Sequence, residues 1–370
     1  MFVESIELSH YRNIDSARVE FSPGINIFFG DNAQGKTNLL EAIYMCGTSR
    51  SHRGSKDREL IAFEEDEAHI LMEFMKKKLS RRVDVHLRRN KSKGIAVDGS
   101  VIRRSSDLMG LLPMVFFSPE DLSIIKNGPA GRRKFLDMEM SQLDRAYLSS
   151  LIQYNRILSE RNQLLKQIQD HPSLIETLDG WDMQLVKNGC DLIRKRERFV
   201  RYISKESGSI HHDLTGGREK LQVTYDKNVE EDAFYRIVEE NRKKDIINGT
   251  TSAGPHRDDL KLTADGIDIR RFGSQGQQRT AAISLKLSEI RLIENMTGEK
   301  PVLLLDDVLS ELDSNRQHWL MDSMKDIQIM VTCTGLEEFI NRRIKMDRLF
   351  KVEKGRIEFV NNSTNIGLKC

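Results

Sequence analysis

A run of eight residues near the start of the chain has the composition and spacing of a loop that binds phosphate. It matches the pattern G-x-x-x-x-G-K-[ST] at every fixed position. In such a loop the glycines let backbone N–H groups point at phosphate oxygens, the lysine adds a positive charge and the final hydroxyl ligates Mg²⁺. Average composition would produce the pattern by chance in about one chain in a hundred of this length. We expect a nucleotide to be bound by Gly30, Asp31, Asn32, Ala33, Gln34, Gly35, Lys36 and Thr37.

The segments on either side of this loop have the secondary structure that the motif requires. Ile25–Phe29, just before it, is a short apolar run rich in strand-forming residues. After it, Leu39, Leu40 and Ile43 recur at helical spacing. The sequence therefore predicts a strand, a loop and a helix. An ordinary glycine-rich turn is the alternative interpretation.

A second chemical feature stands near the other end of the chain. The apolar run over residues 301–305 suits a strand buried on both faces, and it ends in Asp306 and Asp307. Asp306 is the expected Mg²⁺ ligand together with Thr37, and Asp307 is placed to orient or deprotonate the attacking water. We therefore expect Lys36, Asp306 and Asp307 to be the catalytic residues. A buried strand with this ending but no nucleotide chemistry is the alternative.

The two halves of this expected site lie far apart in the sequence. The loop ends at residue 37 and the acidic pair begins at residue 306, so both ends of the chain must fold around one nucleotide. What lies between them is an inserted module. We expect an ATPase domain formed by residues 1–117 and 208–370, and an inserted, mainly helical domain over residues 118–207.

The hydrophobic pattern favours this division. A helix start is expected at Ser118, because a hydroxyl cap is followed by a proline and two acids. Apolar residues then recur at helical intervals up to a break at Pro172, and again over residues 174–203. Strand patterns resume after Gly216, with a hairpin turn around Asp265. The expected fold class is α/β, with mixed sheets around the phosphate loop and a helical insertion.

Ahead of the acidic pair, a third motif precedes a helix expected to begin at Thr280. Its residues Ser274, Gly276 and Gln277 are similar to the signature of ABC-type ATPases. Alone, a Ser-Gly turn before a helix is common and is explained by simple capping. Its place in the chain favours the signature, because residues 310–313, Ser-Glu-Leu-Asp, follow the acidic pair where a D-loop belongs. A signature helix points its N-terminus at the γ-phosphate held by a second subunit, which encloses two nucleotides between two chains.

The bulk composition leaves the partner open. The chain has 58 basic and 56 acidic side chains, a net charge of +2, which says little about what it binds. Its four cysteines are scattered without a C-x-x-C pattern, so neither a disulfide framework nor a zinc site is expected. There is no apolar signal core and no run of 18 apolar residues. We expect a reduced, cytoplasmic chain with no membrane partner.

One segment is nevertheless strongly basic. Between residues 76 and 104 stand eleven basic and two acidic residues, a local charge of +9. Such a charge suits DNA phosphates, and the scarcity of aromatic residues favours backbone contacts to duplex DNA over base stacking. We expect DNA contacts from Lys76, Lys77, Lys78, Arg81, Arg82, Arg88 and Arg89. The alternative is that these side chains only protect an edge hairpin from aggregation.

Further motifs are spread along nearly the whole chain. They are Tyr11-Arg12-Asn13, Phe117-Ser118-Pro119-Glu120-Asp121-Leu122, Gly128-Pro129 with Arg132-Arg133 and Phe135-Leu136-Asp137, and Gly254-Pro255-His256-Arg257-Asp258-Asp259. Together with the phosphate loop, the signature and the acidic pair, they resemble the motifs of RecF proteins, which are bacterial ABC-type, SMC-like ATPases of recombinational repair.

The resemblance implies an ABC-type ATPase head that binds ATP and Mg²⁺ and forms an ATP-dependent homodimer on DNA. It implies action with RecO and RecR at gaps and single/double-strand junctions, recombinase loading, replication restart and SOS induction. Arg12 and Asn13 are implied to lie near the nucleotide. Transporter-type ATPases carry Glu where Asp307 stands, and the shorter side chain predicts slow hydrolysis that acts as a switch.

Three other functions compete with this one. A transporter subunit would carry a switch histidine, whereas Thr332 follows the strand expected over residues 327–331, and it would not explain the basic segment. A nuclease would need a further carboxylate cluster with metal-ligand spacing, which we do not find. If Asp307 is inactive, the chain is expected to be a non-hydrolysing, ATP-dependent DNA-binding protein. A Q-loop is not assigned, and residues 254–259 are expected to form a structural turn.

Overall fold

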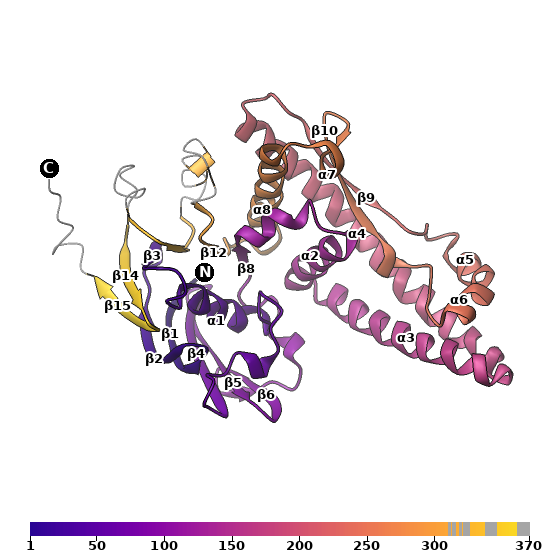
Figure 1. The fold of residues 1–370 in the computed structure, drawn as a ribbon, viewed down its shortest axis with the longest axis horizontal. Coiled ribbons are helices and arrows are strands. Elements are labelled where there is room, and N and C mark those ends of the chain that lie inside the picture. The colour runs from indigo at the N-terminus through magenta and orange to yellow at the C-terminus, as the bar shows by residue number, and fades with distance from the viewer. Residues whose placement is uncertain (310–311, 313–315, 318–319, 321–325, 337–345, 361–370) are drawn as a thin grey trace. The chain divides into compact units, whose positions relative to one another are not determined.

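The chain folds into two compact units. The fold is that of a computed structural model, which describes residues 1–309, 312, 316–317, 320, 326–336 and 346–360. The first unit consists of Met1–Asp121 and Ile293–Cys370, and the second of Leu122–Leu292. Each unit has its own sheets and helices (Figure 1).

The first unit contains a six-stranded sheet that carries the phosphate loop. Its order is β15-β14-β3-β13-β12-β8, and all neighbours are parallel except β14 and β15. The strands are β3 (Ile25–Phe29), β8 (Met114–Phe117), β12 (Val302–Asp306), β13 (Ile329–Cys333), β14 (Arg348–Glu353) and β15 (Arg356–Val360). Strands β8, β12 and β13 are buried along their whole length, which is why they read as continuous apolar runs.

This sheet joins the two ends of the chain. Strand β3 is N-terminal, yet both of its neighbours, β13 and β14, are C-terminal. Ile27 stands opposite Val331 on one side and Leu349 on the other, and all three side chains are buried. The expected union of the N- and C-terminal segments around one phosphate loop is confirmed.

A second six-stranded sheet in this unit is antiparallel throughout, in the order β2-β1-β4-β5-β6-β7. Its strands are β1 (Phe2–Tyr11), β2 (Ile14–Glu20), β4 (Glu67–Lys76), β5 (Leu79–Arg88), β6 (Lys91–Val97) and β7 (Ser100–Val101). Helix α1 (Lys36–Thr48) is buried along most of its length and shares one hydrophobic core with both sheets. Short 3₁₀-helices cover Asp57–Glu59, Ser105–Asp107 and Pro119–Ile124.

The helix start expected at Ser118 is wrong in its geometry. Pro119–Ile124 is a 3₁₀-helix, and the α-helix begins only at Pro129. The Ser118 N–H and hydroxyl both donate to Oδ2 of Asp121, at 2.8 and 3.1 Å, so the acid is the acceptor in place of the serine. Pro129 restarts the chain as a helix because proline fits the first helical position.

The second unit is built on long helices. Helices α3 (Arg145–Asp170) and α4 (Leu178–Thr215) lie side by side (Figure 1). The others are α2 (Pro129–Leu143), α5 (Phe234–Glu240), α6 (Arg242–Asn248), α7 (Ile269–Phe272) and α8 (Gln275–Thr297), with 3₁₀-helices at Pro172–Thr177 and Pro255–Arg257. The break expected at Pro172 is confirmed, whereas α4 continues beyond the expected end near residue 203. Within the described ranges, no helix is long and apolar enough to cross a membrane.

A three-stranded antiparallel sheet completes the second unit. Its order is β11-β10-β9, with β9 (Leu221–Asp226), β10 (Asp259–Ala264) and β11 (Ile267–Asp268). Asp265 and Gly266, which join β10 to β11, have φ angles of 48° and 81°. Two successive positive φ angles are typical of a tight hairpin turn, so the turn expected at this point is confirmed.

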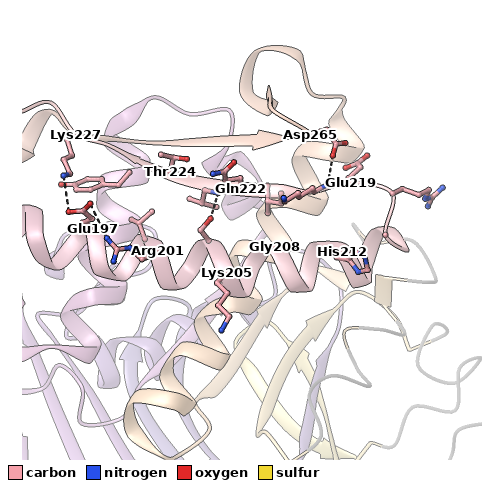
Figure 2. A pocket seen from close by; sticks show the side chains of 18 residues that line it. Glu197, Arg201, Lys205, Gly208, His212, Glu219, Gln222, Thr224, Lys227 and Asp265 are labelled. Atoms are coloured by element: carbon pink, nitrogen blue, oxygen red, sulfur yellow. Dashed lines mark hydrogen bonds and ion pairs between the residues drawn. The ribbon is translucent and has the colours of Figure 1, made fainter.

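The outer edge of β9 runs along α4. An open groove of about 960 Å³ lies between the two elements (Figure 2). The Val223 N–H donates to Oγ of Ser204 on α4 at 3.0 Å, and an ion pair of 3.3 Å joins Lys227 to Glu197. Because α4 occupies one of its backbone donors, this edge is protected from pairing with the strand of another chain.

The boundary between the units differs from the expected one. We expected the helical insertion to end at residue 207 and the ATPase domain to resume there. The second compact unit instead extends to Leu292, within α8. The reason is that β9, β10 and β11 form a sheet of their own that packs on α4, and they do not join the sheet of the phosphate loop.

Inside the second unit, a buried ionic network holds three helices together. Arg161 Nε donates to Oδ1 of Asp182 at 2.6 Å, and its Nη1 donates to Oδ2 of Asp245 at 2.9 Å. All three side chains are at most 1% exposed. The network joins α3, α4 and α6.

Replacing Arg161 by Met should destabilise the chain by about 3–5 kcal/mol, because it removes a buried cation and leaves two carboxylates without it. The measurement is urea unfolding. The matched control is Arg194→Met on α4, where the arginine is 55% exposed and pairs with Glu231 at 3.4 Å. That exposed pair should contribute less than about 1 kcal/mol. Equal unfolding midpoints for the two variants would contradict a stabilising role for the network.

The segment from Gly254 to Asp259 has a structural role in this unit. Asp258 is completely buried and accepts from Arg196 Nη1 at 3.1 Å. Asp259 accepts from Nε and Nη2 of Arg132, at 2.6 and 2.8 Å. The segment thereby connects β10 to α2 and α4, in agreement with the structural turn expected from the sequence.

His256 of the same segment is half-buried as a neutral ring. Its Nδ1 lies 2.7 Å from the Tyr154 hydroxyl. Burial lowers the pKa of His256 to about 4, which keeps the imidazole uncharged at neutral pH.

Candidate nucleotide-binding site

The phosphate loop connects β3 to α1, as the sequence predicts. Gly30 has a φ of 153°, and a Cβ there would lie 2.2 Å from the Val352 carbonyl oxygen, so only glycine fits. Helix α1 begins at Lys36 and has no side-chain cap at its N-terminus. Its first N–H groups and its dipole are therefore directed at the loop, which suits an anion.

Lys36 lies inside the curve of the loop. Its side chain is only 7% exposed. The Nζ atom donates to the carbonyl oxygens of Gly30 and Asp31, at 2.5 and 2.8 Å. Phosphate oxygens are stronger partners for an ammonium group than neutral carbonyls, so a bound nucleotide can take over these hydrogen bonds.

The acidic pair meets the loop at the end of three parallel strands. Asp306 ends β12, and Thr37 Oγ1 donates to its Oδ1 at 2.8 Å across a separation of 269 positions. Thr332 on β13 donates to the same Oδ1 at 2.8 Å and accepts from the Asp307 N–H at 2.9 Å. Asp307 has a φ of 53°, which is uncommon outside glycine and often marks a functional position. The expected D-loop residues Ser310, Glu311 and Asp313 lie outside the described residues.

The oxygens of Thr37 and Asp306 fit a magnesium ion. Mg²⁺ binds oxygen ligands and is usually held by one or two protein groups, with water and substrate phosphates completing the shell. The Thr37 hydroxyl and the Asp306 carboxylate lie within hydrogen-bonding distance of each other beside the loop. Among the described residues, there is no cluster of three or more His, Cys, Asp or Glu side chains suited to a metal.

A cavity of about 340 Å³ lies at this edge of the sheet. It is lined by Asn13, Asn32, Ala33, Gln34, Gly35, Lys36, Thr37, Asn38, Arg53, Asp306, Asp307 and Thr332. Most of the loop and both acidic residues thus surround one space, although they come from opposite ends of the chain.

The two residues expected near the nucleotide by resemblance have different environments. Asn13 lines the cavity, donates from Nδ2 to the Gln34 carbonyl at 3.1 Å and accepts from Asn38 at 2.8 Å. Arg12 donates to both carboxylate oxygens of Glu41 on α1, at 2.9 and 3.1 Å. Arg12 does not line the cavity, so its contact supports α1.

Sequence reasoning missed several residues beside the acidic pair. A second cavity of about 240 Å³ is lined by Thr37, Glu41, His52, Arg53, Phe116, Ser118, Pro119, Glu120, Asp306 and Asp307. Arg53 lines both cavities and has no ion pair among the described residues, which suits it to phosphate. Glu120 follows β8, the parallel neighbour of β12, and the rule that ligand sites form at the carboxyl ends of parallel strands could have identified it. No sequence pattern around Arg53 indicated that this residue would line the site.

The signature motif forms the start of α8, five residues before the expected start at Thr280. Ser274 Oγ accepts from the Gln277 N–H at 3.2 Å, and Gln277 Oε1 accepts from the Ser274 N–H at 2.9 Å. This reciprocal capping box starts the helix early. Ser274 and Gly276 are exposed, so the N-terminus of a 23-residue helix is open at the surface of the second unit.

Most of the basic side chains expected at DNA have partners within the protein. Lys76 Nζ donates to the carbonyl oxygens of residues 110 and 111. Arg81 pairs with Asp98 at 2.6 Å, and Arg82 pairs with Asp84 at 3.3 Å. The two acids inside the basic segment therefore each pair with one of its arginines.

The remaining four basic residues fall into two groups. Arg89 donates to three carbonyl oxygens of the loop at residues 62–65, and Arg88 donates weakly to the Ser92 carbonyl at 3.4 Å. Lys77 and Lys78 form the turn between β4 and β5, are exposed, and have no side-chain partner within the described ranges. DNA contacts of the segment stay a prediction, and these two lysines are the members whose charges are open to an anion among the described residues.

Comparison with known proteins places the chain in a family. It matches the family model described as RecF/RecN/SMC N terminal domain over residues 2–358. It is 52% identical over 358 residues to the DNA replication and repair protein RecF of Lachnoclostridium phytofermentans, covering 97% of this chain and 99% of that protein. It is 54% identical over 359 residues to the RecF protein of Lachnospira eligens, with coverages of 96% and 99%.

Solved structures agree with this result. A structure of the recombination mediator protein RecF with ATP in the RecFOR pathway has a TM-score of 0.90 and 35% identity, covering 97% of this chain and 98% of that one. The Smc head domain of Pyrococcus furiosus has a TM-score of 0.56 at 16% identity, with coverages of 97% and 96%, and is similar in fold alone. The chain belongs to the RecF family and has the fold of a RecF/SMC-type ATPase head.

Proposed function

We propose that the chain is an ATP-controlled DNA-binding protein of recombinational repair, which dimerises on DNA when ATP and Mg²⁺ are bound. The observation that carries this proposal is the contact between Thr37 and Asp306 beside the phosphate loop, which assembles a nucleotide site from both ends of the chain. The ATP-bound state of a solved relative, described as a recombination mediator, supports both the nucleotide and the pathway.

Each side chain at the site has a task in this proposal. Lys36 and the first N–H groups of α1 hold the phosphates, and Arg53 adds a positive charge at the same cavity. Thr37 and Asp306 hold Mg²⁺, which when bound neutralises charge between the phosphates. Asp307 orients or deprotonates the attacking water. Its short side chain makes the chain a weak ATPase whose hydrolysis is a switch.

In this proposal the signature of one chain meets the phosphate loop of another chain, which requires a dimer. Each chain supplies the loop and the acidic pair of one site, while Ser274, Gly276 and Gln277 of the other chain close it over the γ-phosphate. ATP binding closes the dimer and hydrolysis reopens it.

The wider role follows family membership. The chain acts in the cytoplasm on duplex DNA and at gaps and single/double-strand junctions. With RecO and RecR it promotes recombinase loading, and it contributes to replication restart and SOS induction.

The decisive test is sedimentation velocity of the purified chain with ATP, with ADP and with gapped DNA. ATP should produce a dimer, DNA should strengthen it, and ADP should leave a monomer. A dimer that forms equally well without nucleotide would exclude control of dimerisation by ATP.

The DNA surface is tested by changing Lys77 and Lys78 together to Glu. These lysines are exposed at the β4–β5 turn, so losing two phosphate contacts should make the slope of log affinity against log salt shallower by about 2. The measurement is fluorescence anisotropy of duplex DNA with ATP over a range of salt concentrations.

The matched control for this surface is another pair of adjacent exposed lysines. Lys243 and Lys244 on α6 are both exposed, and their change to Glu alters the net charge by the same amount. If both variants lose affinity to the same extent, the effect is one of overall charge, and the turn at Lys77 is not a DNA contact.

A further inference from the structure

We propose that the exposed ring of Phe272 stacks on the adenine base of the nucleotide held by a second copy of the chain. This inference rests on the proposed ATP-closed dimer and adds a residue that reads the base. Phe272 is 74% exposed and stands two residues before Ser274, the first residue of the signature. An exposed aromatic ring beside a surface that meets a partner is typical of a contact residue.

The backbone that carries the ring is held with respect to the signature. Asp268 caps the short helix α7 by accepting from the Arg270 and Arg271 N–H groups, at 2.9 and 3.3 Å. Ile269 is 1% exposed and anchors this helix in the unit. Phe272 is therefore presented on an ordered backbone, so little loop entropy is lost when it binds.

Hydrogen bonds also hold the connection between α7 and α8. The Ile269 carbonyl accepts from the Gly273 N–H at 2.9 Å and from Gln278 Nε2 at 3.1 Å. A Cβ on Gly273 would lie 2.5 Å from that same oxygen, so the close approach of α7 to the signature requires glycine. Two residues span at most about 7 Å. A ring fixed this near to Ser274 lies within reach of the ribose and base when Ser274 is at the γ-phosphate.

The charge around the ring suits a nucleotide. Arg270 and Arg271 flank Phe272, are exposed, and form no ion pair among the described residues. Two unpaired guanidinium groups favour an anionic partner such as a triphosphate over a purely apolar protein surface.

The nucleotide site on the first unit has no described aromatic side chain that could stack on the base. The residues that line the phosphate cavity, within the described ranges, include no aromatic side chain. A nucleobase has two π-faces, and stacking on an aromatic ring is a common source of affinity for it. A ring supplied by the second chain would couple recognition of the base to closure of the dimer.

The test compares Phe272→Ala and Phe272→Trp with the wild-type chain. The first readout is the ATP concentration that gives half-maximal dimer in sedimentation. It should rise by about 5- to 150-fold in Phe272→Ala, because stacking is worth ~1–3 kcal/mol per base, and Phe272→Trp should restore it. The second readout is the fluorescence of 2-aminopurine riboside triphosphate, which should be quenched on dimerisation by the wild-type chain and not by Phe272→Ala.

The control is Phe63→Ala. Phe63 is 96% exposed on the first unit and lies outside both cavities, so its loss should change neither readout. An unchanged ATP requirement and unchanged quenching in Phe272→Ala, with an intact ATP-dependent dimer, would overturn this inference and leave the proposed function standing. Weaker DNA binding at an unchanged ATP requirement would assign the ring to DNA and also overturn it. Absence of any ATP-dependent dimer in the wild-type chain would instead remove the proposed function.

Discussion

Replacing Lys36 by Met is expected to leave the chain monomeric at ATP concentrations that dimerise the wild type. The ammonium group is almost fully buried inside the loop and is the charged partner expected for the phosphates. A hydrogen bond to a charged group contributes about 1.5–3 kcal/mol, so ATP affinity should fall by roughly 10- to 100-fold or more. The measurement is sedimentation velocity with ATP, paired with a titration of fluorescent ATP.

Met is chosen because it keeps an unbranched side chain of nearly the same length and removes the ammonium group. Unfolding of the apo variant should therefore remain close to that of the wild type. A second measurement, with ATP and gapped DNA, separates the effect of ATP on dimerisation from the effect of DNA. If Lys36→Met still dimerises at the wild-type ATP concentration, the phosphate loop does not control dimerisation. The proposal of an ATP-controlled switch would then be wrong.

Changing Asp307 to Asn should abolish most ATP hydrolysis while preserving the ATP-dependent dimer. Asn has nearly the same shape and tolerates the positive φ of this position, so the backbone bond from Asp307 N–H to Thr332 is retained. What is lost is the carboxylate that orients or deprotonates water, an effect of about 10²–10⁴-fold. The measurement is single-turnover hydrolysis of radiolabelled ATP, with and without DNA.

Asp306→Asn gives the contrasting result. Asp306 accepts hydrogen bonds from both Thr37 and Thr332 and is the expected Mg²⁺ ligand. Its substitution should weaken Mg²⁺-dependent nucleotide binding itself, so the dimer as well as hydrolysis should be lost. If Asp307→Asn hydrolysed ATP at the wild-type rate, Asp307 would not be the base, and Glu120 in the adjoining cavity would become the candidate.

The nucleotide site could largely be predicted because its parts are short local motifs. The loop from Gly30 to Thr37 needs its residue types at fixed spacing, and the run before Asp306 is apolar because the strand is buried on both faces. Those constraints act within a few residues, so they are visible in one sequence. Their union was also predictable, since two halves of one site must meet.

Contacts across the sheet could not be predicted in the same way. Arg53 reaches both cavities from a loop with no motif, and Thr332 joins Asp306 to Asp307 only because β13 lies between β3 and β12. Strand order is a property of the whole sheet and has no local signal. The segment containing Glu120 was recognised as a motif, but its place beside the acidic pair depends on β8 pairing with β12.

The free charge of the basic segment could not be predicted for a related reason. The charge of +9 already subtracts Asp98 and Asp84, the partners of Arg81 and Arg82. It leaves out Asp57 and Asp66, acids outside the segment that pair with Lys93 and Arg89 at 3.0 and 3.7 Å. Counting charge along one segment overestimates the charge of a surface when acids from other segments pair with its basic residues. Lys77 and Lys78, at the tip of a hairpin, are exposed and have no side-chain partner among the described residues.

The sequence by itself determined the chemistry of this protein: a phosphate loop with Lys36 and Thr37, an acidic pair ending a buried strand, and a capped helix behind Ser274. These depend on residue types and spacings that physical chemistry restricts tightly. The tertiary structure alone decided which strands are neighbours, which described cations have an acidic partner, and that the strands over residues 221–268 belong with the helices. Such features arise from pairings between distant segments, whose free energies are set by packing and by burial of charge.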